Sequence, residues 1–279
     1  MKRILLTFFL AAPVFAAAQT THDEGLSFGA RTTVEADAKL AQGLHLTAHE
    51  EYRYYFEGED IMRFYSGIGL EYKVFPFLKL GGEYELVNRL KYDADVPGNV
   101  WSIRHRGSFF LTGTYKTPFW QVSLKETLRL THRPGEMNRW QSPRNALALK
   151  SKVTVKYFGW ESVIPFAAFE VRNTLNEAAY SGVYNSSAEK NKDIYTNETF
   201  LGYTHAYVNR LRAQLGVTVK FNKHHELDFY LLGDRYRDKS IDTNREGSGS
   251  WEKHGLMLKS IDWYTGYMVS AGIGYKWSF

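Results

Sequence analysis

The chain has 279 residues, no cysteine, a formal net charge of +5 and an aromatic content of 16%. The absence of cysteine excludes disulfides and a lipid-modified cysteine, and so small a net charge gives no reason to expect a nucleic-acid partner. The 19 Tyr, 18 Phe and 23 Gly against only 7 Pro are the composition expected of many twisted strands with aromatic residues at two interfaces.

The N-terminus has the pattern of a secretory signal peptide. Lys2 and Arg3 precede an apolar run from Ile4 to Leu10, and small residues follow up to Ala18. A retained anchor helix is the alternative, but the apolar run is far shorter than the roughly 20 residues that a membrane-spanning helix needs. We therefore expect a signal peptide of residues 1–18, cleaved after Ala18, and one exported domain of residues 19–279.

Apolar and polar residues alternate along nearly the whole mature chain, which is the pattern of half-buried strands. The expected strands, in chain order, are residues 26–38, 44–56, 62–74, 78–86, 103–115, 120–133, 147–157, 163–172, 210–221, 226–234 and 267–279. Many of them reach the roughly 9 to 11 residues needed to cross a bilayer with tilt, whereas soluble strands usually have about 5 or 6. The alternation therefore predicts one all-β domain, an antiparallel transmembrane β-barrel of about 10–12 strands with a polar lumen.

Short turns and long polar loops also alternate, as they do between the periplasmic and extracellular ends of outer-membrane barrels. The longest expected loop covers residues 176–204, and another covers residues 237–253. With the long loops outside and the C-terminus in the periplasm, the first strand starts at the outer end. Eleven strands is an odd number, and closed barrels of this class normally have an even one. Either a further strand lies in residues 255–264, or the N-terminal segment enters through the lumen.

The final strand, Tyr267 to Phe279, has one face that is apolar from end to end. Aromatic residues flank small aliphatic ones on this face, as a strand in contact with lipid requires. Its last residues, Tyr275, Trp277 and Phe279, resemble the C-terminal signal by which outer-membrane barrels are recognised for insertion. An edge strand of a soluble sandwich is the alternative. We expect the outer membrane of a Gram-negative bacterium as the location, with its lipid and the barrel-insertion machinery as partners.

A recurrent pattern joins a hydrophobic, glycine-containing strand to a short turn and a strand rich in Tyr, Arg and Glu. It reads GIGLEYKVFPFLKLGGEYEL, LALKSKVTVKYFGWESVIPFAAFE and LRAQLGVTVKFNKHHELDFYLL, and the chain closes on GIGYKWSF. With these segments the chain resembles domain-of-unknown-function family 2490, secreted proteins of Gram-negative bacteria. The resemblance covers most of the mature chain and implies a barrel, and the family brings no established activity or functional residues.

If the apolar faces meet lipid, the polar faces line the interior. Three consecutive strands then contribute basic residues and no acidic ones, and they form a basic wall of Arg104, Arg106, Lys125, Arg129, Arg133, Lys150, Lys152 and Lys156. Strands before it and near the end of the chain contribute an acidic wall of Glu71, Glu83, Glu85, Glu226, Asp228 and Asp234.

These walls predict a transverse field that favours small anionic solutes such as acidic sugars, phosphates or carboxylates, as in a narrow porin-like channel. The alternative is a filled structural or surface-interaction barrel, in which the basic side chains pair with the acidic walls across a narrow lumen.

Catalysis and metal binding have weaker sequence support. His105, His132 and His225 fall on the lipid-facing set, where a lipid-modifying enzyme would place its base, but no G-x-S-x-G motif accompanies them. His45 and His49 lie about 13 Å apart along one strand at roughly 3.3 Å per residue, and the adjacent His224 and His225 point to opposite faces. We therefore expect no catalytic residue, no metal ion and no cofactor.

Two acidic residues, Glu50 and Glu126, fall on otherwise apolar faces. A charge at the bilayer midplane is destabilising, although less so for Glu than for Lys. We expect both residues near an interface. Contact with another subunit or with a lipid headgroup is the alternative.

Overall fold

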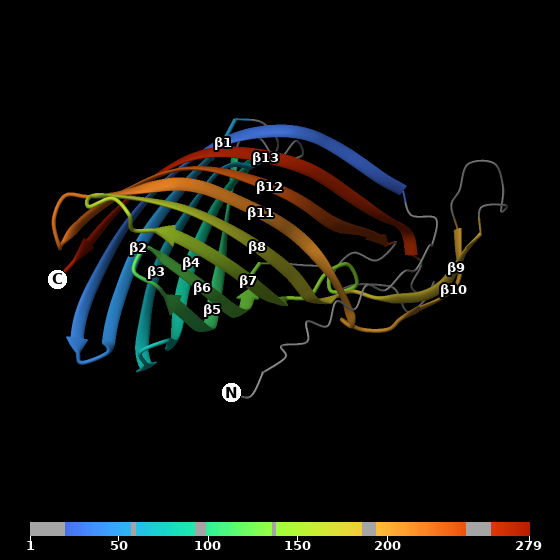
Figure 1. The fold of residues 1–279 in the computed structure, drawn as a ribbon. Coiled ribbons are helices and arrows are strands. Elements are labelled where there is room, and N and C mark those ends of the chain that lie inside the picture. The colour runs from blue at the N-terminus through green and yellow to red at the C-terminus, as the bar shows by residue number, and fades with distance from the viewer. Residues whose placement is uncertain (1–19, 57–59, 93–98, 136–137, 186–193, 244–257) are drawn as a thin grey trace.

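The computed structural model describes residues 20–56, 60–92, 99–135, 138–185, 194–243 and 258–279. Within them, eleven strands form one closed barrel and two more form a separate hairpin (Figure 1). The predicted signal peptide lies outside the described residues. No helix in the described part of the chain is long and apolar enough to span a membrane.

The strands are β1 (Thr20–Ala41), β2 (Leu44–Tyr55), β3 (Asp60–Phe75), β4 (Leu78–Tyr92), β5 (Asn99–Lys116), β6 (Trp120–His132), β7 (Asn145–Tyr157), β8 (Val163–Glu177), β9 (Tyr180–Asn185), β10 (Ile194–Phe200), β11 (His205–Lys220), β12 (His225–Thr243) and β13 (Leu258–Ser278). Around the barrel their order is β1-β13-β12-β11-β8-β7-β6-β5-β4-β3-β2, and β9 pairs with β10 alone. The predicted barrel of about 10–12 strands is confirmed.

The barrel closes through one parallel pair. β1 and β13 run side by side in the same direction, from Thr20 opposite Asp262 to Asp37 opposite Ser278, and the other neighbouring pairs in the barrel are antiparallel. When each strand runs opposite to the one before it and the number of strands is odd, the last strand runs in the same direction as the first. The pair that closes the barrel must then be parallel. The expectation of a fully antiparallel barrel is therefore wrong at this pair, whereas the count of eleven is right.

Neither explanation offered for the odd count is needed. The segment before Tyr264 is the start of β13 and not an additional strand. From Thr20 onward, β1 lies in the barrel wall and not in the lumen.

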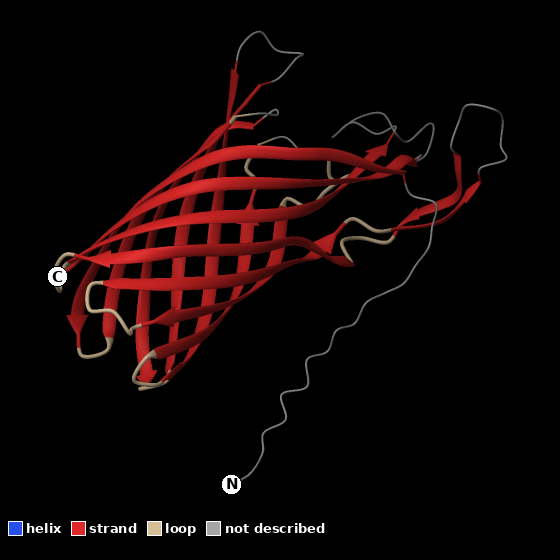
Figure 2. Ribbon diagram, turned by 45° about the horizontal axis from the view of Figure 1, so that its top comes forward, coloured by secondary structure: helices blue, strands red, loops and turns tan. Residues whose placement is uncertain are grey.

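The two ends of the barrel differ, and Figure 2 shows the short turns gathered at the end where the C-terminus lies. We call this the turn end and the opposite end the loop end. β1 runs from the loop end to the turn end, where the Lys39 N–H donates to the carbonyl of Phe279 at 2.9 Å. The first strand therefore starts at the end with the long loops, as predicted.

Two expected loops contain strand instead. β12 continues to Thr243 through the polar stretch RDKSIDT, which shows no alternation but pairs with β13 through backbone hydrogen bonds that do not depend on side-chain type. The expected loop of residues 176–204 contains the β9–β10 hairpin.

The outer face of the barrel is apolar, with aliphatic residues between two sets of aromatic ones. At the turn end Phe75 stacks on Phe77, with ring centroids 5.6 Å apart, and near the loop end Tyr52 contacts Phe64 at 4.9 Å. Leu215 and Leu231 between them are 66% and 62% exposed. So large an exposed apolar surface on a closed barrel is consistent with a membrane barrel.

Glu50 and Glu126 lie on this outer face, as expected, but in the middle of β2 and β6 and not near a strand end, where an interface was expected. Each has a hydrogen-bond partner on the neighbouring strand. The Ser66 hydroxyl donates to Glu50 at 2.8 Å, and the Ser151 hydroxyl donates to Glu126 at 2.6 Å. In both cases the serine is the residue directly opposite in the strand register. A local partner therefore reduces the cost of placing each carboxylate on an apolar surface.

Candidate functional site in the barrel interior

The alternation of the strands turns both predicted walls toward the barrel interior. Two internal cavities lie in the described part of the barrel, and nine of the predicted wall residues line one or both of them: Arg104, Arg106, Lys125, Arg129, Arg133, Lys150, Lys152, Glu83 and Glu85. The larger cavity, about 340 Å³, is the central cavity, and the smaller, about 280 Å³, is the loop-end cavity.

The remaining wall residues line neither cavity, and most of them bond to a neighbouring strand. Lys79 pairs with Glu71 at 2.5 Å, and Lys220 pairs with Glu226 at 3.2 Å. The Thr218 hydroxyl donates to Asp228 at 2.5 Å. Lys156 is on the same face of β7 as Lys152, four residues closer to the turn end.

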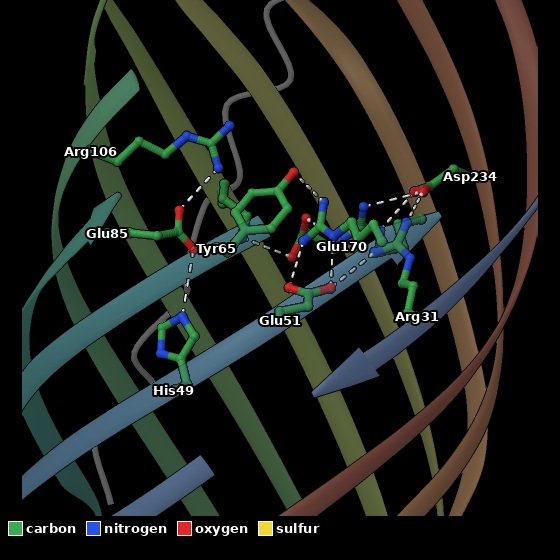
Figure 3. Close-up of polar contacts among 11 residues, drawn as sticks. Arg31, His49, Glu51, Tyr65, Glu85, Arg106, Glu170 and Asp234 are labelled. Atoms are coloured by element: carbon green, nitrogen blue, oxygen red, sulfur yellow. Dashed lines mark hydrogen bonds and ion pairs between the residues drawn. The ribbon is translucent and has the colours of Figure 1, made fainter. Parts of the chain in front are cut away.

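A chain of ion pairs, with one hydrogen bond to a tyrosine at its end, runs around the barrel wall beside the central cavity. Its members are Lys150, Glu170, Arg212, Asp234, Arg31, Glu51, Arg53 and Tyr65, and we call them the central ion network. It starts on β7, passes through β8, β11, β12, β1 and β2, and ends on β3. Figure 3 shows that these side chains meet inside the barrel.

Asp234 is the most enclosed member of the central ion network, and none of its side chain is exposed. Arg212 donates to it at 2.7 and 3.1 Å through Nε and Nη2, and Arg31 donates at 3.2 Å. Arg31 reaches Asp234 past β13, which presents the small residues Ser270 and Gly272 at this level. One carboxylate therefore holds two guanidinium groups together beside the closing pair of strands.

The ion pairs of the network link residues on one strand, on adjacent strands, or on strands separated by one other. They follow the wall, so they differ from the pairing across a narrow lumen that a filled barrel would use. Lys150 pairs with Glu170 of the adjacent β8 at 3.3 Å, and Arg106 pairs with Glu85 of the adjacent β4 at 3.0 Å (Figure 3). Acidic residues on flanking strands thus neutralise part of the basic wall.

The loop-end cavity has an arginine-rich lining with few acidic residues. Eight arginines and Lys239 line it, against the two acidic residues Glu177 and Asp238. The arginines are Arg63, Arg89, Arg104, Arg106, Arg129, Arg133, Arg172 and Arg210. Seven of them come from β3, β4, β5, β6, β8 and β11, and Arg133 directly follows β6. The predicted basic wall of three strands is therefore one part of a wider basic lining.

Five of these arginines, Arg63, Arg106, Arg129, Arg172 and Arg210, also line the central cavity. We call them the arginine ring, because their strands are distributed around most of the barrel.

Buried nitrogen atoms in this lining lack protein partners. The Nε atoms of Arg106, Arg133, Arg172 and Arg210 are buried without a hydrogen-bond partner among the described residues. A buried N–H without a partner is unfavourable, and an N–H on a cation more so. An anion in the cavities would accept hydrogen bonds from such groups, and guanidinium is suited to carboxylate and phosphate.

The predicted walls already contained Arg106 and Arg129 of the arginine ring, and Lys150 and Asp234 of the central ion network. The alternation did not indicate that Arg31, Arg172, Arg210 and Arg212 belong with the basic wall. Arg31 and Asp234, for example, are 203 residues apart in the chain. The available signal was their position on the same inward face as the wall residues.

A small apolar cluster lies at the loop end. Ala178, Ile241 and Leu258 form a small apolar core against which Tyr203 packs. The Tyr203 hydroxyl donates to the carbonyl of Arg139 at 2.5 Å, and burial raises the pKa of this phenol, so it stays protonated as a donor. The β6–β7 connection is thereby attached to the segment before β11.

The histidines that suggested a lipid-modifying enzyme lie on the outer face. The hydrogen-bond partner of each is a tyrosine or an asparagine, and not the serine that a hydrolase would use as its nucleophile. His105 bonds to the Tyr84 hydroxyl at 2.7 Å and His132 to the Asn145 side chain at 2.7 Å. His225 bonds to the Tyr275 hydroxyl, also at 2.7 Å. At the C-terminus, the rings of Trp277 and Phe279 pack against each other with centroids 4.7 Å apart.

The fold and its interior define the class of protein: a closed β-barrel with an apolar outer face and an arginine-rich lumen. The chain belongs to the family of proteins of unknown function DUF2490, whose model matches residues 28–245. No curated protein matches the chain.

Proposed function

We propose that this protein is an outer-membrane barrel that admits small anionic solutes through its arginine-lined interior. The observation that carries the proposal is the arginine ring, five arginines that line both cavities. Rings of Arg or Lys are the arrangement used by pores for anions and phosphates. The loop end would face outside, so that an anion meets the eight arginines of the loop-end cavity first.

The unpartnered Nε atoms support an anionic solute more than a filled barrel. A barrel that uses its interior only for packing would pair these groups, because burying them unpaired is costly. The expected solutes are small molecules that carry a carboxylate, phosphate or sulfate group. Their size suits cavities of about 280 and 340 Å³, and their charge suits guanidinium groups. Because the histidines on the outer face have Tyr and Asn partners, we propose a binding and transport role and not a catalytic one.

Conductance in a planar bilayer with a salt gradient tests this proposal. The refolded mature protein is expected to give stable, anion-selective openings. Changing Arg172 and Arg210 together to Gln should lower the anion-to-cation permeability ratio about fivefold or more, since removing one charge close to an ion changes its free energy by roughly 1 kcal/mol.

Lys79→Gln is the matched control, because Lys79 is also an inward cation but is paired with Glu71 near the turn end. It should leave the permeability ratio close to that of the wild type. Silence from correctly folded, heat-modifiable protein would reject transport, and an unchanged ratio in the Arg172→Gln, Arg210→Gln variant would reject the arginine ring as its basis.

The membrane location has a separate test in Glu126, which lies among leucines on the outer face of β6. If this face meets hydrocarbon, Glu126→Leu should stabilise the barrel in lipid vesicles by on the order of 1–2 kcal/mol, because a carboxylate is unfavourable at that depth. Urea unfolding followed by tryptophan fluorescence measures the change. Destabilisation by Glu126→Leu would place this surface in a polar environment instead.

A further inference from the structure

Two glycines on β3 leave space on the inner wall for side chains from the strands on either side. His49 of β2 is opposite Gly67, and Gly67 is opposite Glu85 of β4. The next inward position of β3 is Gly69, which is opposite Glu83. A Cβ atom at Gly67 would overlap the imidazole of His49, so the absence of a side chain there is what allows His49 to lie across β3 toward β4.

This arrangement brings three metal-ligating side chains together. One ligand atom each from His49, Glu83 and Glu85 lies within 4.8 Å of the other two. His49 Nε2 is 3.6 Å from Glu85 Oε1, and Figure 3 shows the two side chains pointing toward each other. Ligands about 2.1 Å from a tetrahedral zinc ion are roughly 3.4 Å apart, so a small rotation of the Glu83 side chain would complete a three-ligand site.

The charges within the cluster favour a cation, because two carboxylates accompany one imidazole, while Arg106, Lys125 and Arg129 line the same cavity. Glu83 and Glu85 are two residues apart on one face of β4, so their carboxylates repel each other. Glu85 Oε2 is paired with Arg106 at 3.0 Å, while the Glu83 carboxylate has no ion pair among the described residues. Glu85 could therefore offer Oε1 to a metal ion while Arg106 holds Oε2 from outside the coordination shell, as outer-shell partners of metal ligands do.

We propose that His49, Glu83 and Glu85 form a binding site for a divalent transition-metal ion of the zinc class. An imidazole with two carboxylates suits zinc and its neighbours, whereas calcium and magnesium prefer oxygen ligands alone. Glu83 and Glu85 line the central cavity, so the fourth coordination position would be open to that cavity. The site goes beyond anion transport and does not depend on it.

The sequence did not indicate this site, because the only partner considered for His49 was His45 on the same strand. His45 and His49 are too far apart along β2 to share an ion, and that remains true. The partners of His49 come instead from β4, two strands away, across the gap left by Gly67 and Gly69.

Isothermal titration with zinc chloride, on the mature barrel refolded in detergent without a histidine tag, tests the proposal. We expect one zinc ion per barrel. His49→Ala should lower the affinity at least roughly 100-fold, because changes outside the coordination shell alone cost about 10- to 100-fold. His45→Ala is the matched control, since His45 also faces inward on β2 but bonds to Asp37 at 2.9 Å, and it should bind zinc as the wild type does.

Glu83→Gln provides a second variant, because it keeps the size of the side chain and breaks no ion pair of the described residues. Heat-modifiable migration shows that each variant is folded, and cobalt absorption bands report coordination by nitrogen and oxygen. Zinc binding that survives in Glu83→Gln or His49→Ala, that is lost in His45→Ala, or that calcium matches would overturn the site, as would the absence of binding by the wild type.

Discussion

Replacing Asp234 with alanine is expected to destabilise the barrel by roughly 3–5 kcal/mol, the range for removing one partner of a buried ion pair. The Asp234 side chain is fully enclosed, and its loss leaves Arg31 and Arg212 close together with no carboxylate between them. Arg212 would retain only the 3.7 Å pair with Glu170. Urea unfolding in lipid vesicles, followed by tryptophan fluorescence, gives the free energy of unfolding.

Glu226→Ala is the control for this prediction. Glu226 is on the same strand as Asp234 and also faces inward, but its pair with Lys220 joins side chains that are 29% and 41% exposed. Solvent screening reduces such pairs to about 0–1 kcal/mol. If Asp234→Ala were no more destabilising than Glu226→Ala, the central ion network would not be a stabilising feature of the closed barrel.

Deleting residues 277–279 is expected to prevent most of the protein from assembling in the outer membrane of an expressing Gram-negative host. Phe279 exchanges two backbone hydrogen bonds with β1, through the carbonyl of Asp37 and the N–H of Lys39, both at 2.9 Å. Its ring also packs on Trp277. The deletion therefore removes contacts at the pair of strands that closes the barrel. Heat-modifiable protein in the membrane fraction measures assembly.

A milder variant separates recognition by the insertion machinery from stability. Phe279→Ala keeps the backbone hydrogen bonds, so it should refold in lipid vesicles nearly as the wild type does, yet its assembly in cells should fall if the terminal aromatic residue is recognised. Phe279→Trp, which retains an aromatic ring, is the control. Equal assembly of Phe279→Ala and wild type in cells would reject the C-terminal signal.

The sequence by itself determined the strands and the face to which each side chain belongs. Because side chains alternate with a period of two, the alternation correctly directed Lys150 and Arg106 inward and Leu215 outward. It also gave the short turns and the direction of the first strand. It failed where alternation stops, in the polar end of β12 and in the β9–β10 hairpin, because backbone pairing there does not need an apolar face.

Only the tertiary structure decided which charged groups meet. Periodicity is a local property, so it does not say that β1 pairs with β13, and that closure brings Arg31 to Asp234. Nor does it say that His49 reaches Glu85 across Gly67. Partners on neighbouring strands are set by register and by the order of strands around the barrel, and an odd number of strands imposes a parallel closing pair. The sequence therefore shows which charged residues face the lumen, whereas their ion pairs form only when the barrel closes.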